Sequence, residues 1–200
     1  MQDQMILYNG PTSPFGRKTK IVSLIHKIKL KEKIINVYES EFLDKYNPIR
    51  KIPTLITKHM TIVDSDNICL YFDSISKKKT LFPKKDYWKI ISITSIANGL
   101  MEAILERRME LIRPKREKSK NFINKQEKRI NRTISWLESN WNNYNEKYLT
   151  MDQIAIACSL DYATFRFNNE WKVLNPKLNI WFNSFKKKDF MKMTLPKKNK

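Results

Sequence analysis

The sequence contains few glycines and few cysteines, and each shortage excludes a class of site. Three glycines in 200 residues leave little room for flexible linkers or for a glycine-rich loop that binds phosphate. The two cysteines, Cys69 and Cys158, are far apart and form no CxxC or CxxH pattern, so we expect inert packing, with neither a disulfide framework nor a metal site. The two histidines, His26 and His59, have no evident partners and suggest neither catalysis nor metal binding. This composition fits a reducing compartment, and we expect a cytoplasmic protein.

Long hydrophobic runs are also missing. The longest apolar run, at residues 154–158, is too short to cross a membrane. The first five residues contain no basic stretch followed by an apolar run, as an export signal would. We therefore expect no membrane association.

Cations outnumber anions, with 39 Lys and Arg against 20 Asp and Glu. A formal net charge of +19 invites a nucleic-acid partner, because clustered cations release counterions from phosphates. The lysines, however, are spread along the whole chain together with many Asn and Ile, as AT-rich codons would produce, and most should form solvated faces. We therefore do not expect a nucleic-acid partner. The densest basic segment, at 107–120, either binds an anionic substrate tail or forms an exposed helix end.

Strands and helices alternate in the prediction for the first eighty residues. A short apolar strand at 5–8 runs into turn-forming residues, and a helix follows at once. Ser13 is a good N-cap for that helix, and Pro14 suits its first position. The later elements are a strand at 34–37, a hairpin of strands at 53–57 and 61–63, and a helix from Ser65. The strand-helix-strand order at the start requires a parallel pair of strands with a right-handed crossover.

A charged, proline-containing break separates this region from the rest of the chain, and strand-like alternation does not recur after it. We place a first domain at 1–77, a linker at about 78–85 and an all-helical domain at 86–200.

Four helices are predicted in this second domain, at 88–112, at 123–141, from Thr150 and from Pro176. The third has a complete start signal. Thr150 is its N-cap, Gln153 is the capping-box partner, and Leu149 with Ile154 forms a hydrophobic staple.

Four short motifs occur in the order and at the spacing found in one known family. They are Thr12-Ser13-Pro14-Phe15 at the first helix, Asn47-Pro48 followed by Lys51-Ile52-Pro53-Thr54-Leu55, Asp64-Ser65 before the next helix, and the capped segment Leu149-Thr150-Met151-Asp152-Gln153-Ile154-Ala155. With the order of predicted elements, they make nearly the whole chain resemble the glutathione transferases. The segments 127–132, 155–158 and 165–166 resemble a compact bacterial subgroup of that family. The resemblance implies an α/β thioredoxin-like N-terminal domain with a four-stranded mixed sheet, followed by an all-α helical bundle.

The resemblance also implies a glutathione site in the first domain. In this fold the Ile52–Pro53 bond is cis, which turns the backbone of Ile52 outward to pair with the cysteinyl backbone of glutathione. Asp64 and Ser65 stand where the γ-glutamyl end binds, with Ser65 and the helix N-terminus taking the carboxylate and Asp64 facing the amine. Phe15 also belongs to the implied site. Two structural alternatives stay open: Pro53 simply begins an edge strand, and Ser65 is only an N-cap.

Ser13 holds the position at which related proteins carry the Ser or Cys that faces the glutathione sulfur. A free thiol has a pKa of about 8.5, and lowering it by about two units requires about 2.7 kcal/mol. One hydrogen bond to a charged acceptor contributes about 1.5–3 kcal/mol and a helix N-terminus about 0.3–2 kcal/mol, so no general base is needed. The resemblance thus implies that Ser13 stabilises the glutathione thiolate. Thr12 is a rival for this role, and the structural alternative for Ser13 is a role as N-cap alone.

The second substrate implied by the resemblance is an electrophilic, hydrophobic small molecule. It would lie against the predicted helix that carries Met101, Leu105, Arg108 and Met109, whose identities vary across the family and do not reveal the electrophile. Glutathione would be a co-substrate, with no metal, and a homodimer is expected by resemblance alone. The competing interpretation is a binding or regulatory protein that keeps the fold without turning over glutathione.

Overall fold

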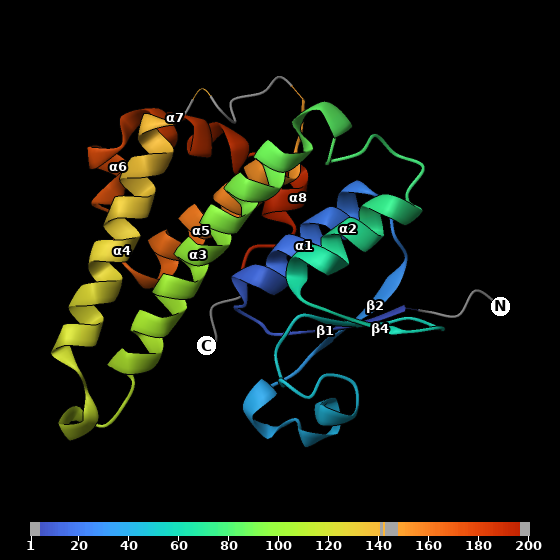
Figure 1. Cartoon of the computed structure of the whole chain (residues 1–200), viewed down its shortest axis with the longest axis horizontal. Coiled ribbons are helices and arrows are strands. Elements are labelled where there is room, and N and C mark those ends of the chain that lie inside the picture. The colour runs from blue at the N-terminus through green and yellow to red at the C-terminus, as the bar shows by residue number, and fades with distance from the viewer. Residues whose placement is uncertain (1–4, 141, 143–147, 197–200) are drawn as a thin grey trace. The chain divides into compact units, whose positions relative to one another are not determined.

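The computed structural model describes residues 5–140, 142 and 148–196, and the chain divides into two compact units. The first comprises Met1–Leu81 and Asp189–Lys200, and the second comprises Phe82–Lys188. Figure 1 shows the elements of both units, most of them labelled, and each unit is described below by itself.

A four-stranded mixed sheet organises the first unit. Its strands are β1 (Met5–Asn9), β2 (Leu30–Ile34), β3 (Thr54–Ile56) and β4 (Thr61–Val63). The strand order is β2-β1-β3-β4, with β1 parallel to β2 and the other two pairs antiparallel. This confirms the predicted thioredoxin-like sheet.

The predicted strand at 34–37 is wrong in position, because β2 ends at Ile34. Val37 instead begins a short 3-10 helix, η1 (Val37–Glu39), which Asn36 caps by accepting a hydrogen bond from the N–H of Tyr38. The apolar pair Ile34-Ile35 suggested that the strand begins at Ile34, yet β2 is an edge strand that ends there, and Ile34 is 55% exposed. Hydrophobicity is a poor guide to an edge strand, because few of its side chains face the core.

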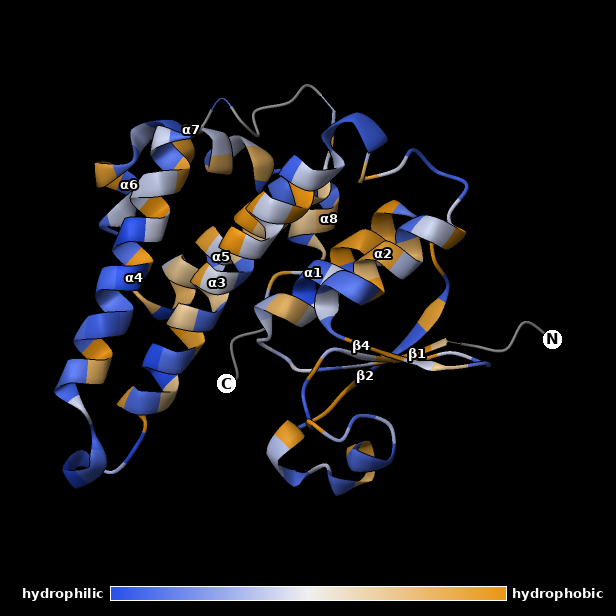
Figure 2. Cartoon of the chain, in the orientation of Figure 1, coloured by the Kyte–Doolittle hydropathy of each residue, from blue (hydrophilic) through white to orange (hydrophobic). Residues whose placement is uncertain are grey.

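Two helices of the first unit, α1 (Pro14–Ile25) and α2 (Ser65–Ile75), pack against each other. The apolar core of this unit consists of wholly buried side chains, among them Leu7, Ile21, Leu55, Ile68 and Phe72. Burying each of these side chains contributes about 1.5–3 kcal/mol. Figure 2 shows the resulting concentration of hydrophobic residues in α2.

The last described part of the chain joins the first unit. Helix α8 (Asp189–Lys192) packs on α1, where Arg17 donates hydrogen bonds to the carbonyl oxygen of Met191 (3.1 Å) and to the hydroxyl of Thr194 (3.2 Å). The sequence-based boundaries assigned residues 189–196 to the helical domain. In the structure these residues group with the first unit. The sequence did not indicate this, because the hydrogen bonds of the buried Arg17 join segments that are far apart in the chain.

The second unit is helical. It contains α3 (Tyr87–Leu111), α4 (Lys120–Ser139), α5 (Met151–Arg166), α6 (Trp171–Leu174) and α7 (Pro176–Phe185), with short 3-10 turns η3 (Lys84–Asp86) and η4 (Lys115–Glu117). Helix α3 packs against both α4 and α5, and α5 is buried from Met151 to Leu160. No helix among the described residues is long and apolar enough to span a membrane.

The four predicted helices of this unit begin close to the expected positions, whereas the short helix α6 was not predicted. Pro176 opens α7 as predicted, and α4 begins at Lys120, slightly earlier than expected, because Ser119 caps it. Thr150 holds the N-cap position of α5, but its side chain caps no backbone N–H, so the predicted capping box does not form. Trp141, expected near the end of the second helix, lies outside the described residues.

Candidate functional site

Ser13 is the N-cap of α1, and its hydroxyl oxygen accepts a hydrogen bond from the N–H of Gly16 at 3.1 Å. Pro14 follows as the first helical residue, where its missing N–H costs nothing. A serine hydroxyl that accepts one hydrogen bond still has its own hydrogen to donate. Because Ser13 is partly exposed, it can cap α1 and also donate that hydrogen to a ligand at the helix N-terminus. Thr12 is partly exposed too, but it stands outside the cap.

The loop before Ser13 depends on two of the three glycines in the chain. A Cβ on Gly16 would lie 1.5 Å from Oδ1 of Asn9, and that oxygen already accepts the N–H of Gly10 at 2.8 Å. A Cβ on Gly10 would lie 2.5 Å from Cδ1 of Ile52 and 3.7 Å from Cβ of Ser13. Gly10 therefore lets Ile52 pack closely against the Ser13 loop. The sequence reasoning missed Asn9, Gly10 and Gly16, although glycines on both sides of Ser13 in a glycine-poor chain were a usable signal.

The peptide bond between Ile52 and Pro53 is cis, as predicted. The turn before it is held by the buried Asn47, whose Nδ2 donates to the carbonyl oxygen of Lys51 (2.8 Å) and to the hydroxyl of Thr54 (2.9 Å). The backbone N–H and C=O of Ile52 make no hydrogen bond with any described residue. A backbone donor and acceptor thus stand unpaired beside the Ser13 loop, where an extended peptide can pair with both.

Asp64 and Ser65 form the start of α2, and the alternative in which Ser65 is only the N-cap is wrong. Asp64, not Ser65, is the N-cap, and its Oδ1 accepts the N–H groups of Asp66 (2.7 Å) and Asn67 (3.4 Å). Asp64 has a φ of 73°, a conformation that non-glycine residues adopt only at a cost of order 1–3 kcal/mol. Ser65 is the first helical residue, and its hydroxyl bonds to no described residue. Ser65 is therefore available to bind an anion together with the helix N-terminus.

A buried ion pair lies next to this helix start. The side chain of Lys18, on α1, is wholly buried, and its ammonium pairs with the carboxylate of Asp66, on α2. The side chain of Asp66 is 32% exposed. This contact ties the helix that begins beside Ser13 to the helix that begins at Ser65. The sequence reasoning missed it. Its signal was a lysine at position 18 in register with the apolar stripe at Ile21 and Ile25.

His26, interpreted from the sequence as lacking a partner, has one. Its Nε2 lies 3.0 Å from Oδ1 of Asp73 on α2, and Asp73 also accepts the hydroxyl of Thr80 (2.6 Å) and the N–H of Leu81 (2.7 Å). Burial opposes ionisation of Asp73, but the hydrogen bonds from His26 and its other two donors outweigh burial and lower its pKa. The contact between His26 and Asp73 joins α1 to α2, and the bonds from Thr80 and Leu81 attach the segment after α2 to the same carboxylate. The role of the pair is therefore structural.

The residues expected to face a second substrate belong to α3, in the second unit. The side chain of Met101 is wholly buried, whereas Leu105, Arg108 and Met109 are partly exposed. Phe15, expected to help bind glutathione, is partly exposed in the first turn of α1. Cys69 and Cys158 are buried and form no disulfide, and no group of three or more potential metal ligands occurs in the described part of the chain.

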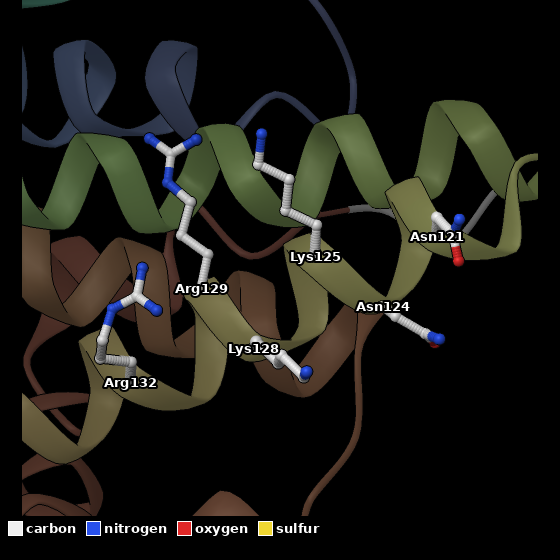
Figure 3. Close-up of a pocket in the computed structure, with 6 residues that line it drawn as sticks. All are labelled: Asn121, Asn124, Lys125, Lys128, Arg129 and Arg132. Atoms are coloured by element: carbon white, nitrogen blue, oxygen red, sulfur yellow. The ribbon is translucent and has the colours of Figure 1, made fainter.

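A basic surface hollow runs along α4, as Figure 3 shows. It has a volume of about 480 Å³ and is lined by Asn121, Asn124, Lys125, Lys128, Arg129 and Arg132. Arg129 extends towards α3, where Glu102 and Glu106 lie 3.9 Å and 3.8 Å from its guanidinium. Part of the positive charge is therefore compensated within the unit. The open, hydrophilic face of α4 in Figure 2 fits a solvated surface.

Comparison with known proteins identifies relatives of this chain along its whole length. A sequence profile for "Glutathione S-transferase, N-terminal domain" matches residues 7–80. The "Uncharacterized GST-like protein YibF" of Escherichia coli (strain K12) is 30% identical over 203 residues, covering 96% of this chain and 100% of the relative. A glutathione S-transferase from Methylobacillus flagellatus KT, solved with glutathione bound, is 25% identical, with a TM-score of 0.91 over 97% of this chain and 100% of its own. A glutathione transferase family member from Pseudomonas fluorescens Pf-5, also with bound glutathione, is 25% identical, with a TM-score of 0.89 over 98% and 100%.

Proposed function

Because this chain belongs to the glutathione transferase family, we propose that it binds glutathione and stabilises its thiolate for conjugation to an electrophilic small molecule. One observation carries the proposal. Ser13, the N-cap of α1, and Ile52, whose backbone N–H and C=O bond to no described residue, both lie close to Gly10. A thiol that is part of a peptide needs both features, a donor for its sulfur and a backbone partner that holds it in place.

The binding roles follow from the groups that the site leaves available. The backbone of Ile52 pairs with the cysteinyl backbone of glutathione, beside Pro53. Ser65 and the N-terminal N–H groups of α2 hold the γ-glutamyl carboxylate, and the exposed Asp64 faces the γ-glutamyl amine. Phe15 covers part of the ligand from α1. The two relatives solved with glutathione support this choice of ligand.

The catalytic role falls to Ser13. Its donated hydrogen bond and the N-terminus of α1 together supply the roughly 2.7 kcal/mol that lowers a thiol pKa by about two units. The thiolate sulfur then forms a bond to the electrophilic carbon, and the leaving group departs with its electron pair. The electrophile lies against α3, at Leu105, Arg108 and Met109, with Met101 supporting them from the core.

The test measures binding and activation of glutathione separately. Calorimetry should detect glutathione binding to the wild-type protein. Titration of the ultraviolet absorbance of the bound thiolate should give a pKa that rises by about 1–2 units in Ser13→Ala, with a loss of turnover on an aryl halide. Thr12→Ala is the matched control and should leave both unchanged. If Thr12→Ala raises the pKa and Ser13→Ala does not, the role passes to Thr12.

Two outcomes would reject the proposal in different ways. Glutathione that binds without any turnover of several aryl halides would identify a binding or regulatory protein with this fold. Absence of glutathione binding would remove the site altogether. We further propose a homodimer, which sedimentation would test, and a cytoplasmic location, with which two cysteines that form no disulfide agree.

A further inference from the structure

The side chain of Asn9, at the end of β1, holds the residue that lies between the two halves of the proposed site. Asn9 is 4% exposed, and its Oδ1 accepts a hydrogen bond from the N–H of Gly10 at 2.8 Å. The carbonyl oxygen of Gly10 accepts the N–H of Ser13 at 3.3 Å. A Cβ on Gly10 would lie 2.5 Å from Cδ1 of Ile52. Asn9 therefore fixes the residue against which both Ser13 and Ile52 are set.

The same side chain also reaches the first turn of α1. A Cβ on Gly16 would lie 1.5 Å from Oδ1 of Asn9, so the Asn9 amide occupies the space that any other residue at position 16 would need. The N–H of Gly16 in turn donates to the hydroxyl of Ser13 at 3.1 Å. One buried amide thus contacts the chain before Ser13 and the chain after it.

Glu32, on β2, fixes which way the Asn9 amide points. Nδ2 of Asn9 donates to Oε1 of Glu32 at 2.9 Å. A reversed amide would set its NH2 group against the N–H of Gly10 and its oxygen against the carboxylate, which opposes donor to donor and acceptor to acceptor. The ammonium of Lys20, on α1, lies 2.9 Å from Oε2 of Glu32 and holds the carboxylate from the other side. These contacts tie α1 and β2 to the loop after β1.

A simpler account is that Asn9 only satisfies the buried N–H of Gly10. A serine hydroxyl can accept a neighbouring N–H as well, without a carboxylate to orient it. That account does not explain why glycine, a poor helix former, stands in the first turn of α1, where its missing Cβ leaves room for the amide. A glycine there is expected if the placement of the amide matters.

We propose that Asn9 is a positioning residue of the glutathione site and that Glu32 orients it. Through the two glycines that it contacts, Asn9 sets where the hydroxyl of Ser13 stands relative to the backbone of Ile52. A hydrogen bond weakens steeply when its distance or angle is wrong, so a displaced Ser13 lowers the pKa of the glutathione thiol less. The inference rests on the proposed function, which gives Ser13 and Ile52 their roles. In this role Asn9 does not touch the reacting atoms.

The test measures the pKa of the bound glutathione thiol by ultraviolet titration and the affinity for glutathione by calorimetry. Asn9→Ala removes the amide and should raise this pKa by about one unit, a tenfold loss in the thiolate equilibrium, and weaken binding about tenfold. Phe72→Leu, in the core of the same unit, is the control for lost stability and should leave both values unchanged. Thermal unfolding compares the stability of the two variants.

Two further variants test the orientation by Glu32 and do not depend on the folding of Asn9→Ala. Asn9→Asp keeps the acceptor for Gly10 but sets a second carboxylate against Glu32, so glutathione should bind about tenfold more weakly. Asn9→Asp/Glu32→Gln exchanges donor and acceptor between the two positions and should restore the affinity to within about threefold of the wild type.

Each outcome decides between the hypotheses. If glutathione binds and Ser13→Ala raises the pKa of the thiol but Asn9→Ala does not, the positioning role is overturned and the proposed function stands. Equal changes in Asn9→Ala and Phe72→Leu would also overturn it, because lost stability would then explain both. An exchange variant that binds no better than Asn9→Asp would overturn the role of Glu32. If wild-type protein does not bind glutathione, the proposed function is overturned and this inference with it.

Discussion

The buried ammonium of Lys18, on α1, is paired with the partly exposed carboxylate of Asp66, in the first turn of α2. The two partners differ in their access to water, because the side chain of Lys18 is 0% exposed and that of Asp66 is 32% exposed. The pair joins the starts of the two helices that carry Ser13 and Ser65. It therefore contributes to stability and also sets the spacing of the proposed glutathione site.

Removing Asp66 should destabilise the protein more than removing Lys18. Asp66→Asn removes the counter-charge of a buried ammonium and should destabilise the fold. A broken buried pair costs about 3–5 kcal/mol, and we expect a loss near the lower end of this range. Lys18→Met should cost less, because the Asp66 carboxylate left behind can reach water. Urea unfolding measures both. The neighbouring pair Lys20–Glu32 is part-exposed on both sides, so Lys20→Met should cost only about 0–1 kcal/mol. Equal losses in Asp66→Asn and Lys18→Met would contradict this account.

Replacing Ser13 by aspartate should separate capping from thiol activation. Asp is as good an N-cap as Ser, so Ser13→Asp should keep the stability of α1, whereas Ser13→Ala should lose about 1 kcal/mol. The aspartate is negative, however, and should raise the pKa of a glutathione thiol bound beside it. Thermal unfolding and thiolate titration of the two variants measure the two effects. A pKa unchanged in Ser13→Asp would argue against contact between residue 13 and the sulfur.

The buried Asp152 should make the protein more stable as the pH falls from about 7 to about 5. Asp152 is 1% exposed in the first turn of α5, and burial raises its pKa from 3.8 to about 6. Because the folded pKa lies above the unfolded one, the stabilisation is complete below about pH 4 and is lost as the pH rises through 6. A shift of this size corresponds to about 3 kcal/mol. The difference in unfolding free energy between the wild type and Asp152→Asn, measured from pH 4 to pH 8, should follow this curve. A difference that does not change with pH would contradict it.

Replacing glycine by alanine should destabilise the protein at Gly16 and stabilise it at Gly99. At Gly16 the new Cβ would lie 1.5 Å from Oδ1 of Asn9, so Gly16→Ala should displace the loop before Ser13 and cost about 1–3 kcal/mol. Gly99 lies inside α3, and a Cβ there would meet only Nη2 of Arg129, at 3.4 Å. Gly99→Ala should therefore stabilise the protein by about 0.5–1 kcal/mol. Chemical unfolding of the two variants gives the comparison, and stabilisation by Gly16→Ala would show that the loop is not held by this contact.

The local chemistry of the sequence was enough to predict the elements and several of their ends. Ser13 with Pro14, and Pro176, mark helix starts because their effects on the backbone act within a few residues. The cis bond at Ile52–Pro53 was implied by the resemblance of its motif to a known family and did not follow from local chemistry. Apolar spacing predicted α3 and α4 because the period of a helix is built into its own sequence.

Only the tertiary structure decided which groups meet across the chain. The pairing of Lys18 with Asp66, the contact of His26 with Asp73 and the attachment of residues 189–196 to Arg17 each join segments that are far apart in sequence. Short-range preferences fix where an element begins, whereas burial and the pairing of charges depend on neighbours that no local pattern specifies.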